Sequence, residues 1–450
     1  MVSAIRRLLT LVGVALGVAA CASDPMVGIR EAYSVGDYRS AVDRLLELKK
    51  RDASNAHLYQ LELGIAHQAN LDPTAAVEVL RKARDTLDTK AEGSYTDWAT
   101  SVFLDDRSTS YPAADYEHVL VRVMLAVCDL MEGGHDAFAY ALQVLEKQQA
   151  IIANFDSGEI ESPKKAYKLV AFGNYLRGII SEQRPRGRSE AQREYAKVLE
   201  LAPWHRDAKA NLERATNGRF CPPGHGVVHV LSMVGRAPFR VEVREQATSD
   251  ALAAAQLIWA VKKQQSFVPI NVPVPIPALA FYRENPEAVA VFIGGKRVGQ
   301  TALITDVEET ARVEFDAMRP WVLARGVIRR TLKAAVVEGS KEVVTHNTSE
   351  RRERRGEADL LRVGIDILGN IWAATEGADL RCWNLLPASF QAMRVELPEG
   401  EHDVVLRAIR NGRVVGGEQR VRVRVHAGYN TFVLGMTPTQ AGGPPPMSSR

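Results

Sequence analysis

Two similar stretches, GDYRSA (residues 36–41) and NLDPTA (residues 70–75), lie 34 residues apart in the first half of the chain. Each begins a segment in which apolar residues recur at helical spacing, as Ala41, Leu45 and Leu48 do in the first. One amphipathic helix cannot bury such a face alone, so both segments need helical neighbours. The pattern therefore predicts a helical repeat.

A third match lies at AQREYAKVLELAP (residues 191–203), where small, aromatic and terminal-proline positions follow at similar spacing. Its partner helix is expected over residues 166–181. A period of 34 residues is typical of tetratricopeptide (TPR) repeats, in which small residues let antiparallel helices approach closely. We therefore expect residues 21–219 to form a TPR-like α-solenoid, stabilised by the stacking of successive units.

The helical pattern stops at CPPGHG (residues 221–226), and strand and helix patterns then mix. Strands are expected at 227–231, 239–244 and 288–293, and helices at 249–263, 307–336 and 358–374. Prolines at alternating positions restrict 267–277 to a loop or a sheet edge. Pro320 predicts a kink or a new start within the helix at 307–336.

Four regular strand patterns end this half, at residues 392–397, 402–409, 414–426 and 429–434. Asn411-Gly412 is the preferred chemistry of a tight hairpin turn. These features predict a C-terminal antiparallel β-meander within a mixed α/β domain spanning 220–435. Residues 436–450, rich in Gly and Pro, are expected to be a disordered tail. The predicted fold class is α+β.

The N-terminus has the order of a secretory signal peptide, with Arg6 and Arg7 before an apolar run that ends in small residues. The small residues lead directly into Cys21, as in a bacterial lipobox. We expect residues 1–20 to be cleaved and Cys21 to be lipidated, because the run is shorter than the roughly 20 residues needed to span a bilayer. The alternative is an uncut membrane anchor. Ala22, rather than Asp, favours the outer membrane and a body facing the periplasm.

The composition is that of a globular protein, with 46% hydrophobic residues, 25% charged residues and a net charge of +3. No charge excess indicates nucleic acid as a partner. Apart from Cys21, three cysteines remain. Cys128 lies in an apolar helical stretch and reads as a buried hydrophobe. A disulfide between Cys221 and Cys382 is an open alternative in an oxidising compartment.

Three groups of residues are candidates for partner binding. They are the paired Asp105 and Asp106, the basic stripe of Arg325, Arg329 and Lys333 at spacing four, and the cluster of Asp379, Arg381 and Trp383. Each group has a structural alternative. The two aspartates could cap helices or form turns. The basic stripe could be a solvent-exposed helix face whose charges pair with carboxylates. The third cluster could be a structural Asp–Arg ion pair beside a buried Trp383.

Motifs for catalysis are missing from the sequence. It contains neither G-x-S-x-G nor H-E-x-x-H, and Gly295-Lys296 lacks the spacing and the Ser or Thr of a phosphate loop. Cys221, His225 and His229 are spaced by four, but a strand would turn His229 away from ligands in the preceding loop. We expect no metal, no cofactor and no catalytic residue.

The chain resembles a group of uncharacterised bacterial lipoproteins with an N-terminal TPR-like helical repeat region. The matching pieces are the lipobox, FLDD (residues 103–106), the tract 312–333, and ADLR (residues 378–381) with Trp383 and Leu386-Pro387. The resemblance covers most of the chain. It implies an envelope component, a class sometimes found beside lipoproteins that assist cell-wall synthesis.

Together these features predict a non-catalytic lipoprotein of the outer membrane, bound to the membrane by its lipid anchor. Its solenoid would offer a concave surface to an envelope protein partner, as repeat proteins do. One alternative is an enzyme or enzyme activator acting on peptidoglycan or envelope polysaccharide. Another is a carrier of lipid, which would require a sizeable apolar cavity.

Overall fold

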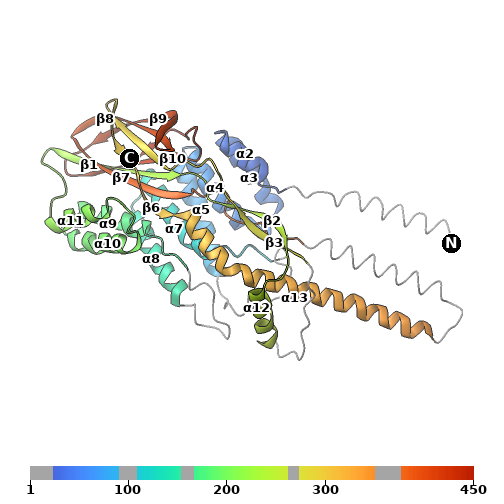
Figure 1. The fold of residues 1–450 in the computed structure, drawn as a ribbon. Coiled ribbons are helices and arrows are strands. Elements are labelled where there is room, and N and C mark those ends of the chain that lie inside the picture. The colour runs from blue at the N-terminus through green and yellow to red at the C-terminus, as the bar shows by residue number, and fades with distance from the viewer. Residues whose placement is uncertain (1–23, 91–108, 154–166, 262–272, 350–376, 450) are drawn as a thin grey trace.

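The computed structural model describes residues 24–90, 109–153, 167–261, 273–349 and 377–449. It is a mixed α+β fold, with helices in the first half and antiparallel sheets towards the C-terminus. Figure 1 shows the helices lying against one side of the strands, with α13 (Val307–Ser349) extending away from the rest. Within the described residues, no helix combines the length and the apolar character that crossing a bilayer requires.

Helices of the first half pack in succession, each against the next along the chain. They are α2 (Val27–Ser34), α3 (Tyr38–Arg51), the short η1 (Ala53–Asn55), α4 (Ala56–Ala69), α5 (Pro73–Lys90), α7 (Asp115–Glu132), α8 (Ala137–Ala153), α9 (Phe172–Gln183), α10 (Arg188–Leu201) and α11 (Ala208–Asn217).

Both repeated stretches begin helices, as predicted, and for the same local reason. Asp37 accepts a hydrogen bond from the Ser40 backbone amide at 3.1 Å, and Asp72 accepts one from that of Ala75 at 3.0 Å. An aspartate before the first turn satisfies an amide that has no partner within the helix.

Burial divides these helices into an inner and an outer layer. Inner helices are buried on most sides: 11 of 14 residues in α4, 15 of 18 in α7 and 9 of 12 in α9. Outer helices bury only one stripe: 5 of 18 residues in α5, 6 of 17 in α8 and 4 of 14 in α10. The inner layer therefore lies between the outer helices and a further element of the chain.

A five-stranded sheet covers the inner helices. Its order is β11 (Met447–Ser448), β10 (Asn430–Thr437), β1 (His225–Val234), β7 (Ser389–Pro398) and β6 (Ala302–Asp306). Helix α7 contacts β10, and the rings of Phe172 and Phe390 are 5.0 Å apart between α9 and β7. The side of the inner helices that faces the strands is thus covered by the chain's own sheet.

A second, four-stranded sheet packs on the other face of the first. Its order is β5 (Lys296–Gln300), β4 (Ala288–Ile293), β8 (Gly400–Arg410) and β9 (Arg413–Val425). Val228, Val230 and Val234 of β1 face this sheet, whereas Leu231 and Met233 belong to the core shared with the helices. Strand β1 is therefore buried on both faces, as a central strand must be.

The predicted β-meander is wrong. Only β8 and β9 form a hairpin, around Asn411-Gly412, whereas β7 pairs with β1 and β6, and β10 pairs with β1 in parallel. The chain changes sheets between β7 and β8, and again between β9 and β10. The physical reason is the position of β1, which is buried on both faces and therefore needs a hydrogen-bonded strand at each edge. Strands β7 and β10 fill these two positions, so they do not pair with β8 and β9.

The C-terminal residues are ordered, contrary to the predicted disordered tail. Met447 and Ser448 pair with Leu434 and Val433, and the Ser449 amide donates to the Phe432 carbonyl at 2.8 Å. The Gln419 amide also donates to the Pro444 carbonyl at 2.7 Å. Hydrogen bonds to the backbone hold this Gly- and Pro-rich segment, together with the burial of Pro444 and Pro446 and the packing of Met447 against the core.

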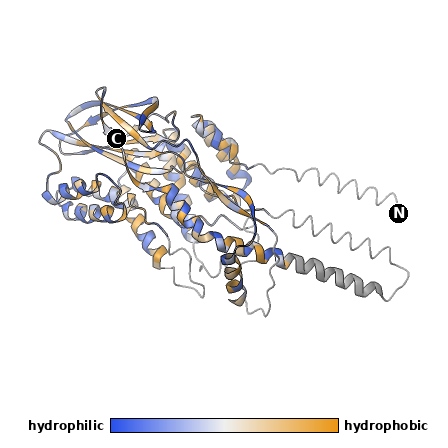
Figure 2. Ribbon diagram, viewed as in Figure 1, coloured by the Kyte–Doolittle hydropathy of each residue, from blue (hydrophilic) through white to orange (hydrophobic). Residues whose placement is uncertain are grey.

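Strand β4 was predicted with its observed bounds, and β2 (Phe239–Glu245) within one residue. The proline-rich tract ends in β3 (Val274–Ala280), which pairs with β2 alone and is an edge, as expected. Helix α13 does not restart at Pro320, because α12 (Ser249–Val261) and β3 pack against the turns that follow it. In Figure 2 most of α12 is coloured hydrophobic, in keeping with this packing.

The helical and strand-rich halves share one hydrophobic core. A continuous cluster of buried residues runs from Leu45 and Leu61 in the helices to Trp383, Phe390 and Leu434 in the other half. The change of secondary structure lies where it was predicted, between the end of α11 and the start of β1. The two halves are nevertheless packed as one unit.

Candidate functional site

The predicted cluster of Asp379, Arg381 and Trp383 lies in a segment, residues 378–386, that is inserted between the two halves. Cys382, Trp383 and Leu386 are 3%, 1% and 0% exposed. The structure therefore brings the predicted cluster together, but places its indole inside the protein rather than on a surface.

Two carboxylates from the inner helices hold the backbone of segment 378–386. Glu62 of α4 accepts hydrogen bonds from the Asn384 amide at 2.6 Å and the Leu385 amide at 2.9 Å. Glu117 of α7 accepts one from the Trp383 amide at 2.9 Å, and also one from the Tyr111 hydroxyl. Both carboxylates are fully buried, so these donors replace the water that each has lost.

Arg381 links the segment to the start of the helical half. Its guanidinium forms two bonds of 2.8 Å with Asp379 and donates to the Asn55 side chain at 2.9 Å and to the Thr109 carbonyl at 2.7 Å. The Arg240 guanidinium in turn donates to the Arg381 carbonyl at 2.9 Å. These contacts favour the structural interpretation of the Asp–Arg pair that the sequence left open.

Burial raises the pKa of two groups here, the Glu62 carboxyl on α4 and the Cys382 thiol in segment 378–386. It raises the pKa of the Glu62 carboxyl to about 7, an increase that hydrogen bonds from Asn384 and Leu385 oppose and the nearby Glu117 reinforces. Burial also raises the pKa of the Cys382 thiol to about 12, so the thiol stays protonated and unreactive at neutral pH. Cys221 and Cys382 are both free, so the disulfide alternative is wrong.

The remaining sequence candidates are not brought into this segment. Arg325 of α13 is 2% exposed and Arg329 is half-buried, so the expected basic stripe is not an open surface at these positions. Lys333 lies on the same helix, and its side chain falls outside the described residues, as do Cys21, Asp105 and Asp106.

The possible metal ligands do not converge. The Cys221 thiol donates to the His225 carbonyl at 3.0 Å, whereas the His229 ring is buried against Phe432 and bonds the Asn430 side chain. Across the described ranges, no three His, Cys, Asp or Glu side chains gather in a way that would hold an ion.

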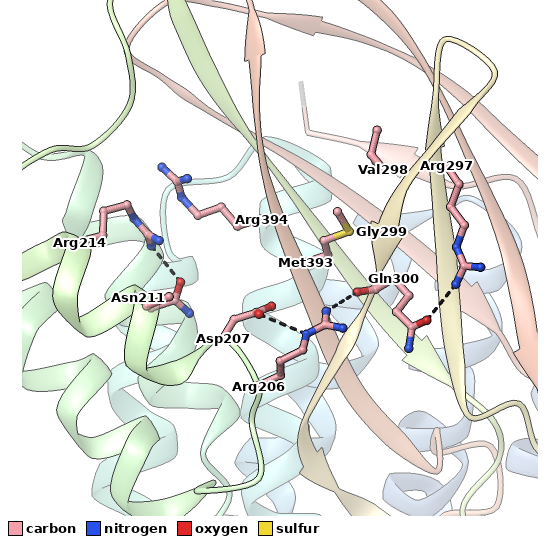
Figure 3. A pocket seen from close by; sticks show the side chains of 11 residues that line it. Arg206, Asp207, Asn211, Arg214, Arg297, Val298, Gly299, Gln300, Met393 and Arg394 are labelled. Carbon is pink, nitrogen blue, oxygen red and sulfur yellow. Dashed lines mark hydrogen bonds and ion pairs between the residues drawn. The ribbon is translucent and has the colours of Figure 1, made fainter. Parts of the chain in front are cut away.

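An open pocket of about 520 Å³ lies between the start of α11, β5 and β7 (Figure 3). Four arginines and one aspartate are the charged residues that line it: Arg206, Arg214, Arg297, Arg394 and Asp207. We call it the arginine pocket. The sequence analysis did not identify it, because its arginines come from three separate parts of the chain.

Gln300 fixes two of the arginines beside each other. Arg206 donates to its backbone carbonyl at 2.8 Å, and Arg297 donates to its side-chain oxygen at 2.9 Å. Figure 3 shows Gln300 between these two guanidinium groups. In the part of the chain that the structure describes, Arg297 forms no ion pair, whereas Arg206 lies 3.2 Å from Asp207.

The other two arginines of the pocket each form an ion pair with a glutamate that is not part of the pocket lining. Arg214 forms an ion pair with Glu182 at 2.6 Å, and Arg394 forms one with Glu396 at 2.7 Å. The Nε of Arg394 is buried and has no hydrogen-bond partner among the described residues. The charges of Arg394 and Arg214 add to burial in lowering the pKa of the nearby His229 well below its usual value.

Local sequence explains how the walls approach each other. The turn after α10 is anchored by His205, which is 3% exposed and whose Nδ1 lies 3.1 Å from the Leu303 carbonyl. Opposite, Gly299 of β5 faces the end of the Met393 side chain of β7, and a Cβ there would lie 2.6 Å from the Met393 methyl group, so this flexible side chain would have to move. The glycine and the turn residues are the only local signals of the site in the sequence.

The chain is thus a mixed α+β protein with two notable sites. Segment 378–386 forms a polar junction between the two halves, and the arginine pocket is open at the surface. Comparison with protein-family models, with curated proteins and with solved structures finds no match for this chain.

Proposed function

We propose that this protein is a lipid-anchored, non-catalytic component of the bacterial outer membrane, facing the periplasm, that serves as a scaffold or accessory factor for an envelope protein. The proposal follows from the lipobox at Cys21 and from the resemblance to lipoproteins with TPR-like repeats. In this proposal α2 to α11 form a TPR-like solenoid, which their succession and their inner and outer layers support.

The observation that carries the scaffold role is the continuous core between the two halves. Segment 378–386, held by Glu62 and Glu117, fixes the helices relative to both sheets. A body of this kind presents its surfaces at a constant geometry, which lowers the entropy cost of binding a partner. Because the inner layer is covered, the proposed contact surface is the outer layer, where Leu142 and Ile152 of α8 are 38% and 44% exposed.

Two measurements test this proposal. Palmitate labelling of intact cells should be lost, and precursor should accumulate, in Cys21→Ala but not in the control Cys221→Ala. A photo-crosslinking residue at position 142 should give a discrete adduct with one envelope protein, whereas the same residue at position 257, 54% exposed on α12, should not. Unchanged labelling of Cys21→Ala refutes the anchor, and the absence of an adduct from the outer-layer positions refutes the scaffold.

A second candidate is an enzyme or an activator acting on peptidoglycan or envelope polysaccharide. The open arginine pocket favours it, since such polymers carry acidic groups. The two candidates differ in one assay. A change produced in a cell-wall substrate by the purified protein alone would favour the enzyme over the scaffold.

A further inference from the structure

A second, smaller cavity of about 280 Å³ adjoins the arginine pocket. Arg206 and Gln300 line both cavities, so the two lie side by side. The second cavity is also lined by Trp204, which is 47% exposed, and by Glu287. The guanidinium groups of the first cavity and the exposed indole of the second therefore lie on neighbouring surfaces, and we call the two adjoining cavities together the groove.

We propose that this groove binds an acidic glycan, with the carboxylate or phosphate groups of the glycan on the arginines and one sugar ring on Trp204. The inference is independent of the lipid anchor and of the protein partner proposed above. It concerns binding only, and includes no chemical step.

The arginines supply the anion recognition. Arg297 is exposed and has no ion pair among the described residues, and its bond to Gln300 leaves other donors of the fork free to meet a ligand. Arg206, 55% exposed at its side chain, lies beside it on the same glutamine. A planar guanidinium group can bind a carboxylate or phosphate in a bidentate manner, so each of these two arginines can bind one acidic group of the ligand.

Trp204 distinguishes a glycan from a simple anion. An isolated phosphate is satisfied by the arginines and leaves the indole without a role, whereas the apolar face of an exposed indole packs against the C–H groups of a sugar ring. Lys168 lies over one face of the indole, with its Nζ 5.6 Å from the ring centroid, and also pairs with Glu309. A sugar ring would therefore pack on the other face of the indole. Asp207 and Glu287 are the acidic side chains in the groove, and provide acceptors for sugar hydroxyl groups.

The open shape agrees with a chain-like ligand. Both cavities are open to the solvent. The first is lined by α11 and the turn before it, by β5 and by β7, and the second also by residues of β4, β6 and β8. A polymer can therefore cross the groove without threading an end through it.

The test is binding of tetragalacturonate, an acidic tetrasaccharide, to the whole mature chain by calorimetry at low salt. A neutral tetrasaccharide and inorganic phosphate are measured in parallel, with vesicles containing phosphatidylglycerol. Variants are Arg297→Gln, Arg206→Gln and Trp204→Ala, with Arg420→Gln as the matched control, because Arg420 is 62% exposed on β9 and pairs with Glu418. Melting temperatures establish that each variant is folded.

We expect tetragalacturonate to bind and the neutral sugar not to bind. Arg206→Gln and Arg297→Gln should each weaken binding about tenfold or more, as expected for a lost charge-assisted hydrogen bond. Trp204→Ala should weaken it severalfold, and Arg420→Gln should leave it unchanged. Four outcomes overturn the inference: no binding of the acidic sugar, equal binding of the neutral sugar, phosphate binding as tight as sugar binding and indifferent to Trp204→Ala, or arginine-dependent binding of the vesicles alone.

Discussion

Glu62 on α4 accepts hydrogen bonds from both the main-chain and the side-chain nitrogen of Asn384, at 2.6 and 3.0 Å, although 322 positions separate the two residues. A buried carboxylate is costly unless donors surround it, and here the donors belong to the other half of the chain. The contact therefore makes the folding of each half depend on the other.

Stability should fall with rising pH because of Glu62. Its pKa is about 7 in the folded protein against an ordinary value of 4.5, so the folded state binds the proton more tightly. The favourable contribution is complete below about pH 4.5 and is lost as the pH rises through about 7, a change of about 3 kcal/mol. Urea unfolding at about pH 5 and pH 8 measures it. Glu62→Gln is the control, and should flatten the pH dependence, whereas an equal slope in both proteins would contradict the assignment.

Glu117→Ala should be among the most destabilising substitutions in the helical half. It leaves the buried amide of Trp383 and the half-buried amide of Ala114 without an acceptor, together with the Tyr111 hydroxyl. The expected loss in the free energy of unfolding is about 3 to 5 kcal/mol. Glu213→Ala, at an exposed pair with Lys209, should cost less than about 0.5 kcal/mol. Chemical denaturation of both variants makes the comparison, and similar losses would show that the Glu117 contacts contribute little.

Arg381→Ala should destabilise the fold, because we assign Arg381 a structural role. A role in partner binding would instead predict loss of that binding with the stability of the fold unchanged. The side chain is 16% exposed and bonds Asp379, Asn55 and the Thr109 carbonyl. We expect a loss of about 2 to 4 kcal/mol, visible as a lower melting temperature. Arg51, 78% exposed in its pair with Glu47, gives the control Arg51→Ala. An unchanged melting temperature in Arg381→Ala would favour the partner-binding interpretation instead.

The C-terminal segment should contribute to stability. A chain that ends at Thr437 loses the pairing of β11 with β10 and the bond from Gln419 to the Pro444 carbonyl. It also exposes the edge of β10. We expect a loss of about 1 to 3 kcal/mol and a greater tendency to aggregate. Chemical denaturation measures the loss of stability, and light scattering measures aggregation. If the truncated protein matched the full chain in both, the prediction of a disordered tail would stand.

Thiol labelling should distinguish Cys221 from the other two described cysteines, Cys128 and Cys382. Cys128 and Cys382 are buried, with the pKa of Cys382 raised to about 12, whereas Cys221 is partly exposed. At about pH 8 a thiol reagent should modify Cys221 in the native protein, and the other two only after unfolding. Peptide mapping by mass spectrometry identifies the labelled sites, with Cys221→Ala as the control. Rapid native labelling of Cys382 would contradict its placement.

Local chemistry predicted the elements of this fold but not their pairing. Asp37 and Asp72 cap their helices through neighbouring amides, and β4 was predicted because its apolar run is bounded by a glycine turn. The division of β7 to β10 between two sheets was not predictable in this way. It depends on the burial of β1 on both faces, which is settled by helices and strands distant in the sequence.

The sequence by itself determined the starts of α3 and α5, the change to strands near residue 220, and the N-terminal pattern on which the proposed anchor rests. Tertiary structure alone decided the roles of the charged residues. Asp379 and Arg381 are neighbours in the chain, yet their contacts with Asn55 and Thr109 make them part of a junction. The arginine pocket joins side chains from positions 206 to 394, and only folding brings like charges so far apart in sequence into one wall. Spacing along a chain records local geometry, whereas burial and electrostatic potential depend on every segment that packs nearby.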